Sequence, residues 1–197
     1  VENKKTVALD EGTNDKLAEA LKNSDVAAVE LPAGEYIMPA TAKGKEITFK
    51  GTDNPEAVAV AVTKVGTGGE NCDYGLDGST VTFENITITT NSSTYIGYAR
   101  CNGTYRNCII NGTYTLYGDS VFEDCTFNVS GDVYNIWTWG APTATFTRCT
   151  FNSDGKALLL YGTENTKLTV NNCTFNDKGG LSDKKAAIEI GNDYNTS

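Results

Sequence analysis

From residue 83 onward, apolar and polar positions repeat in a six-residue pattern: apolar, polar, polar, Cys or Ile, any residue, apolar. The pattern starts at five positions, Phe83, Tyr105, Phe122, Phe146 and Val170. Counted at the fourth position (86, 108, 125, 149 and 173), its copies lie 22, 17, 24 and 24 residues apart. A repeat of this length indicates stacked units, none of which can bury its apolar face alone.

The pattern in the first part of the chain predicts several short strands and one helix. Alternating or continuous apolar runs predict strands at residues 6–9, 26–31, 35–38, 45–51 and 57–65. Four apolar residues at helical spacing predict a short amphipathic helix over residues 16–23, with Asn14 or Asp15 as its N-cap. Residues 66–75 are rich in glycine and predict a loop.

The order of these pieces resembles a known architecture. Three segments carry the resemblance: Asp15-Lys-Leu-Ala-Glu-Ala-Leu-Lys, Val26-Ala-Ala-Val-Glu-Leu-Pro-Ala-Gly-Glu-Tyr and Ile47-Thr-Phe-Lys-Gly. Together they look like the opening of right-handed parallel β-helix proteins of the pectin-lyase-like superfamily, and the later Asn-Cys-Thr-Phe segments look like that family's asparagine turn. The resemblance covers roughly residues 6 to 191. It implies an all-β solenoid with coils of about 22 residues and a short N-terminal capping α-helix.

In a parallel solenoid, equivalent residues of successive coils stack about 4.8 Å apart. The first, fourth and sixth positions of the repeat should then point into the core, and the third should lie at a bend. The third position is occupied by Asn85, Asn107, Asp124, Arg148 and Asn172. Asn and Asp tolerate left-handed backbone geometry, so they suit such a bend. Arg148 departs from this column, and we expect its turn to differ locally.

Four of the six cysteines fall in one column, Cys108, Cys125, Cys149 and Cys173. One interpretation is a row of small buried thiols that fills the interior. The other is disulfide pairing between adjacent coils, which a spacing near 4.8 Å allows. Cys72 and Cys101 lie off the column and could pair with each other.

A second repeated strand carries aromatic residues. Aligned on the residue before a glycine or its equivalent, the column reads Tyr98, Tyr117, Trp139, Tyr161 and Ile190. Alternation places Trp137 on the face of Trp139, and Leu116, Leu158 and Leu160 on the opposite, core-facing side. If the aromatic rings point outward, they form a platform on which sugar rings stack. The alternative is that these rings fill the core.

Charge and composition exclude several classes of function. The formal net charge is −9, from 25 acidic and 16 scattered basic residues, which argues against nucleic acid or an anionic membrane as a partner. No apolar run is long enough for membrane insertion. The chain has no histidine, which removes Ser-His and Cys-His chemistry and most transition-metal sites.

A catalytic site would need converging acids and bases, as in glycosidases or calcium-assisted lyases. Seven residues are candidates for that chemistry: Asp119, Glu123, Asp124, Asp132, Arg100, Arg106 and Arg148. Most of the acids fall in expected turns, and no Asp-x-Asp occurs. We therefore assign no catalytic residue, metal ligand or cofactor, and an enzyme is less favoured than a binding protein.

The sequence predicts one β-helix domain over residues 1–197, with an N-terminal cap over about 1–31 and regular coils over about 32–197. Its end has no recognisable cap, which is compatible with a piece of a longer chain. We expect a non-catalytic bacterial adhesin or glycan-binding module, secreted or at the cell surface, with a carbohydrate or a host or cell-surface glycoprotein as partner. The expected platform is Tyr98, Tyr117, Trp137, Trp139 and Tyr161. The alternatives are a polysaccharide lyase or glycoside hydrolase of the same fold, and a phage tail or appendage protein that binds a receptor.

Overall fold

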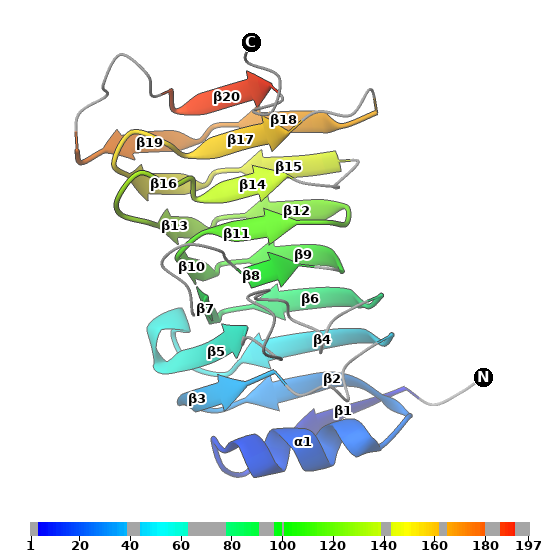
Figure 1. Ribbon diagram of the computed structural model, residues 1–197. Coiled ribbons are helices and arrows are strands. Elements are labelled where there is room, and N and C mark those ends of the chain that lie inside the picture. The colour runs from blue at the N-terminus through cyan, green and yellow to red at the C-terminus, as the bar shows by residue number, and fades with distance from the viewer. Residues whose placement is uncertain are drawn as a thin grey trace, which may run out of the picture.

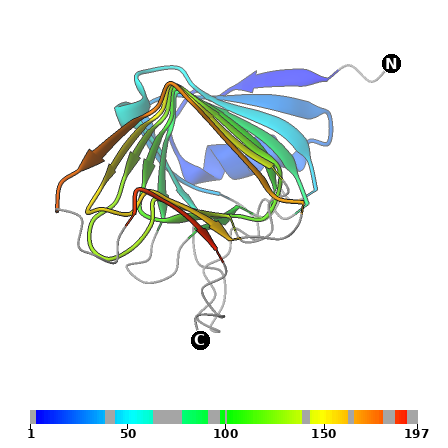
Figure 2. The ribbon, with the colours of Figure 1, turned by 90° about the horizontal axis from the view of Figure 1, so that it is seen from above.

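The structure is a computed structural model. It describes residues 4–38, 44–62, 78–90, 97–99, 101–138, 143–161, 165–179 and 186–191. Within these ranges the chain forms three parallel sheets and a helix. In each sheet, the strands of successive coils stack along one axis (Figure 1). The view along that axis shows the three sheets arranged around a common interior (Figure 2).

The eight-stranded sheet contains, in spatial order, β1 (Lys5–Ala8), β2 (Val26–Leu31), β4 (Glu46–Gly51), β6 (Thr80–Glu84), β9 (Asn102–Arg106), β12 (Ser120–Glu123), β15 (Thr143–Thr147) and β18 (Lys167–Asn171). The seven-stranded sheet contains β3 (Gly34–Ile37), β5 (Val58–Val62), β7 (Thr87–Thr90), β10 (Ile109–Asn111), β13 (Thr126–Asn128), β16 (Thr150–Ser153) and β19 (Thr174–Asp177). The five-stranded sheet contains β8 (Gly97–Ala99), β11 (Tyr114–Leu116), β14 (Ile136–Thr138), β17 (Leu158–Tyr161) and β20 (Ile188–Gly191). A short 3-10 helix, η2 (Pro55–Ala57), precedes β5.

The helix α1 (Asn14–Lys22) lies across the N-terminal end of the solenoid, as Figure 1 shows, and buries Leu17 and Leu21 against it. The helix confirms the prediction, but the predicted N-cap, Asn14 or Asp15, is wrong. Thr13 is the cap, because its hydroxyl accepts a hydrogen bond from the Lys16 amide at 3.4 Å. The Asn14 side chain instead accepts from the amide of Ile37 at 2.6 Å, which ties the helix to β3.

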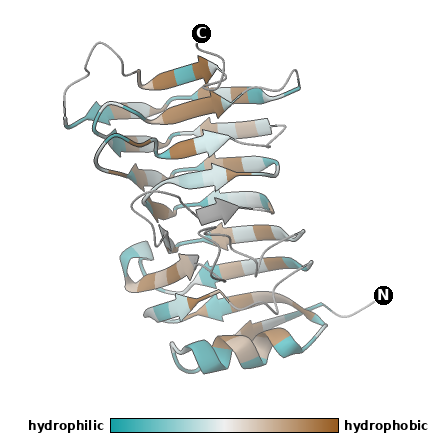
Figure 3. Ribbon diagram, in the orientation of Figure 1, coloured by the Kyte–Doolittle hydropathy of each residue, from teal (hydrophilic) through white to brown (hydrophobic). Residues whose placement is uncertain are grey.

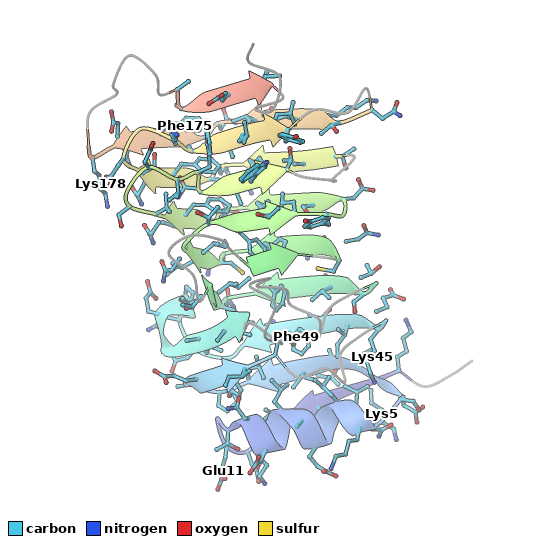
Figure 4. All side chains as sticks on the ribbon, viewed as in Figure 1. Lys5, Glu11, Lys45, Phe49, Phe175 and Lys178 are labelled. Atoms are coloured by element: carbon cyan, nitrogen blue, oxygen red, sulfur yellow. The ribbon has the colours of Figure 1, made fainter. Side chains whose placement is uncertain are left out.

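The core is built on the inward column that the repeat predicted. Phe49, Phe83, Tyr105, Phe122 and Phe146 lie in register on successive strands of the eight-stranded sheet, and all five are fully buried. Their ring centroids are 5.5, 5.5, 4.3 and 5.0 Å apart in that order, with nearly parallel planes. Figure 4 shows Phe49 near the lower end of this column.

A second inward column comes from the seven-stranded sheet, where Phe127, Phe151 and Phe175 stack at 4.6 and 4.9 Å. The two columns meet edge to face, since the rings of Phe122 and Phe127 lie 5.2 Å apart at 66°. Stacked and T-shaped aromatic pairs stabilise a core beyond the area that they bury. Where the structure describes these coils, side chains fill the interior of the solenoid.

In the five coils that start at β6, β9, β12, β15 and β18, the bend between the eight-stranded and the seven-stranded sheet uses one left-handed residue. The five residues at the third position of the repeat have φ between 49° and 55°: Asn85, Asn107, Asp124, Arg148 and Asn172. The expectation that the Arg148 turn would differ is wrong, because its φ of 53° matches the others. Its guanidinium donates two hydrogen bonds, of 2.7 and 2.8 Å, to Asp124 one coil below. At the equivalent position two coils earlier, the side-chain amide of Asn107 donates a hydrogen bond to the side chain of Asn85 at 2.8 Å. The bidentate contact between Arg148 and Asp124 replaces that hydrogen bond.

The four cysteines of the repeat stack as free thiols, which favours the first of the two interpretations. The thiols of Cys108, Cys125 and Cys149 each donate to a main-chain carbonyl of an earlier coil at 3.5 Å. Cys101 is also buried, but its expected partner Cys72 lies outside the described residues.

The neighbouring thiol of Cys108, together with burial, raises the pKa of Cys125. Contact with Cys125 and burial raise the pKa of Cys149 in the same way.

We expect the stability of the protein to fall as the pH rises above about 8.5, the ordinary pKa of a thiol in an unfolded chain. Above that pH the unfolded thiols ionise, while Cys125 and Cys149 keep their protons in the folded state. Each of the two thiols contributes a slope of up to about 1.4 kcal/mol per pH unit. Urea unfolding at pH 7.5, 9 and 10 measures this loss. The double variant Cys125→Ala/Cys149→Ala should lose less stability over that range, and an equal loss in both proteins would contradict the assignment.

Candidate functional site

The register of the five-stranded sheet places the expected aromatic residues in two columns, not one. Tyr98 pairs with Thr115, which pairs with Trp137, and this column continues through Leu159 to Glu189. Tyr161 pairs with Gly191, whereas Ile190 pairs with Leu160. The single column of Tyr98, Tyr117, Trp139, Tyr161 and Ile190 is therefore wrong for Tyr98 and Ile190. The column was aligned on glycine, which is not an equivalent landmark in these strands: Gly97 precedes Tyr98, whereas Gly118 follows Tyr117.

Burial assigns the two faces of this sheet. Tyr114, Leu116, Ile136 and Leu158 are buried in the core, as alternation predicted for the two leucines. Leu160 is buried as well, at 9% exposed. Because Trp137 lies between two inward residues, it belongs to the outer face.

The outer face of the five-stranded sheet is partly covered. Thr115 and Leu159 are almost fully buried although they share the outward column of Trp137. Most of β17 is hydrophobic along its length (Figure 3), and its three leucines are buried. Tyr117, Trp137 and Tyr161 are half-buried, and the indole Nε1 of Trp137 is itself buried. The side chain of Tyr98 and all of Trp139 lie outside what the structure describes.

Trp137 and Tyr161 form an aromatic pair on this outer face. Their ring centroids are 6.1 Å apart and their planes are inclined at 58°. The sheet holds them in place through Thr138, whose hydroxyl donates to the carbonyl of Leu159 at 3.3 Å and accepts from the amide of Tyr161 at 3.1 Å. The two rings therefore come from neighbouring strands with a fixed register, which suits a pre-formed binding surface.

Side-chain contacts hold the loop of residues 129–135 against neighbouring coils of the solenoid. Tyr134 is buried; its hydroxyl donates to the Glu189 carboxylate, two strands from Trp137. The ammonium of Lys156 lies 5.2 Å from the centroid of the Tyr134 ring and pairs with Asp132 at 2.9 Å. These contacts connect the loop to β20 and to the coil between them, so they limit how far the loop can move from the aromatic face.

The described acidic and basic residues that were candidates for a catalytic site do not converge on one place; they form separate hydrogen bonds and ion pairs. Asp119 and Asp124 lie at opposite ends of β12, and Asp119 accepts from the Thr143 hydroxyl at 2.6 Å. Glu123 pairs with Arg106 at 3.1 Å. The Arg148 guanidinium lowers the pKa of Asp124, which is the opposite of what a general acid needs. Arg100 is not among the described residues.

Among the described residues, no group of three His, Cys, Asp or Glu side chains could hold a metal ion. Nor is any helix in the described ranges long and apolar enough to cross a membrane.

Sequence reasoning missed an asparagine ladder on the outer face of the seven-stranded sheet. The side-chain amides of Asn128, Asn152 and Asn176 each donate to the side-chain oxygen of the asparagine one coil below, starting at Asn111, at 3.0, 2.9 and 3.0 Å. The signal was present, since Cys-Thr-Phe-Asn occurs at residues 125–128, 149–152 and 173–176. The asparagine at the last position of that motif forms a column of its own, which the six-residue pattern does not include.

These features define the class of protein: a parallel β-solenoid with a helix across its N-terminal end. Comparison with family models agrees, because the family described as "Right handed beta helix region" matches residues 47–196. The chain belongs to this family, and its resemblance to the pectin-lyase-like superfamily fits that membership. Searches of curated proteins and of solved structures found no match.

Proposed function

We propose that this β-helix is a non-catalytic, glycan-binding module of an extracellular or cell-surface adhesin. The observation that carries the proposal is the Trp137–Tyr161 pair on the outer face of the five-stranded sheet. A half-buried aromatic pair of fixed geometry offers a surface for the apolar face of a sugar ring. Tyr117, two strands before Tyr161, extends the surface along the solenoid axis.

The charge of the protein agrees with a carbohydrate partner. A net charge of −9 repels nucleic acid and anionic lipid but does not hinder a neutral glycan or a glycoprotein. Glu189 lies on the same face and can accept hydrogen bonds from sugar hydroxyls in addition to the one from Tyr134. The proposed partner is a carbohydrate or a glycoprotein of a host or cell surface, and the proposed source is bacterial.

We expect Trp137→Ala and Tyr161→Ala each to weaken retention on a polysaccharide array by about threefold to tenfold, the contribution of one aromatic contact. Both side chains are half-buried, so thermal unfolding must show that each variant is folded. Ile37→Ala, which removes an exposed apolar side chain from the seven-stranded sheet, is the control and should bind normally. Unchanged retention in both folded aromatic variants would refute the platform.

The alternatives make different predictions. A lyase or glycosidase would release unsaturated products or reducing ends from polygalacturonate or other glycans, and the module proposed here should release neither. A phage tail protein would be expected to form trimers, so light scattering separates that alternative from a monomeric module.

A further inference from the structure

A polar hollow lies on the other side of the 129–135 loop, at the corner between the seven-stranded and the five-stranded sheet. Its volume is about 430 Å³, within the usual range for small-ligand sites. The hollow arises from unequal corners. Residues 112 and 113 alone join β10 to β11, whereas residues 129–135 join β13 to β14 one coil above. The longer loop overhangs the shorter corner.

The tight corner depends on Gly112, whose φ of 96° is in the left-handed region. The asparagine ladder begins in the same place, with Asn111 and Asn128 both lining the hollow. The overhanging loop adds the hydroxyl of Ser130 and the apolar side chain of Val133. The walls therefore combine amide and hydroxyl groups with one apolar surface, which suits a hydroxylated ring.

Lys178 gives the hollow its charge. This residue follows β19, and its side chain lines the hollow from a higher coil, at the edge of the solenoid labelled in Figure 4. Among the described residues, the ion pairs do not include Lys178, and no acidic side chain lines the hollow. The carboxylate of Asp154, close to the overhanging loop, accepts a hydrogen bond from the amide of Gly131 at 2.6 Å. The ammonium of Lys178 is exposed, so it can pair with a ligand that carries one negative charge.

We propose that this hollow binds an acidic sugar residue, that is, a hydroxylated ring with one carboxylate, sulfate or phosphate group. The anionic group pairs with the ammonium of Lys178, the ring hydroxyls bond to Asn111, Asn128 and Ser130, and the apolar face of the ring lies against Val133. The site uses a different sheet and different residues from the Trp137–Tyr161 pair. It does not rest on the glycan-binding role proposed for that pair.

The test is a titration of the ¹⁵N-labelled protein with glucose, glucuronic acid, glucose 6-sulfate and glucose 6-phosphate, followed by amide chemical shifts. The acidic sugars should move the amides of Gly112, Thr113 and Ser130, and glucose should bind at least about fivefold more weakly. Lys178→Gln should lower the affinity for the acidic sugars to that for glucose. Ser130→Trp, at an exposed position, should fill the hollow and remove binding of all four. Comparing the three acidic sugars identifies which anionic group the site prefers.

Lys167→Gln is the matched control, because it removes the same charge from an exposed position on the eight-stranded sheet and should leave binding unchanged. Equal affinity for glucose and the acidic sugars would overturn the proposal, as would equal effects of the two lysine variants. Shifts confined to the Trp137 indole would overturn it too, and would instead support the aromatic face. If no acidic sugar shifted the amides of Gly112 and Thr113, the site would also be refuted. That result would say nothing about whether Trp137 and Tyr161 bind glycans.

Discussion

Phe122→Ala should destabilise the protein by about 3 to 5 kcal/mol, the usual cost of removing a buried phenylalanine. Phe122 is fully buried and contacts three other aromatic rings. It stacks between Tyr105 at 4.3 Å and Phe146 at 5.0 Å, and it meets Phe127 edge to face at 5.2 Å. Its loss leaves a cavity in the middle of the column, where coils on both sides depend on it. Urea unfolding followed by circular dichroism measures the change.

Val121→Ala is the control for this experiment. Val121 is the preceding residue on the same strand, but it points outward and is 36% exposed. Its truncation should cost well under about 1 kcal/mol, as is usual at the surface. Similar losses for Val121→Ala and Phe122→Ala would mean that the inward column does not carry the stability of the coil.

Asn107→Val should destabilise the protein by about 2 to 3 kcal/mol for two reasons. Asn107 has a φ of 49°, and an L-residue without a compensating side chain costs about 1 to 2 kcal/mol there. The substitution also removes the 2.8 Å hydrogen bond to Asn85, which contributes about 1 kcal/mol. Thermal or urea unfolding of the variant measures the sum.

Asn107→Gly separates the two contributions. Glycine adopts a positive φ without strain, so only the loss of the hydrogen bond to Asn85 should remain, at about 1 kcal/mol. The valine variant should therefore be clearly less stable than the glycine variant. If the two were equally stable, the left-handed backbone of this bend would not be the reason for asparagine at the position.

The core could be predicted from the sequence because each coil repeats the same alternation. Phe83, Tyr105 and Phe122 occupy equivalent positions of the repeat, and in-register parallel pairing stacks equivalent residues. The steps of 22, 17 and 24 residues from Phe83 to Phe146 agree with the observed register. Any variation in coil length is absorbed by the corners, so it does not disturb the column.

The bend was predicted in position but not in detail. Residue preference alone gave no reason for Arg148 to adopt the geometry of an asparagine. The reason is a neighbour 24 residues earlier, since the carboxylate of Asp124 holds its guanidinium. In the same way, the contact of Asn14 with Ile37 and the cap formed by Thr13 depend on how the helix docks on β3.

The candidate site was only partly predictable. Alternation correctly separated Trp137 from the core-facing Leu116 and Leu158, because period-two alternation is a local property of a strand. The alignment of Tyr98 with Tyr117 failed, because register between coils depends on corner lengths that a glycine landmark does not report. The hollow beside Lys178 depends on the same corner lengths and could not be read from any one segment.

The sequence by itself determined the solenoid, its inward columns and the left-handed bend, because these follow from local alternation and from the repetition of one short motif. The single-domain assignment over residues 1–197 remains a prediction of the sequence. Only the tertiary structure decided which aromatic rings meet, how Asp124 supports Arg148, and where a seven-residue loop overhangs a two-residue corner. Those features join residues from different coils, and their geometry is set by the relative lengths of the corners rather than by the residues of any one strand.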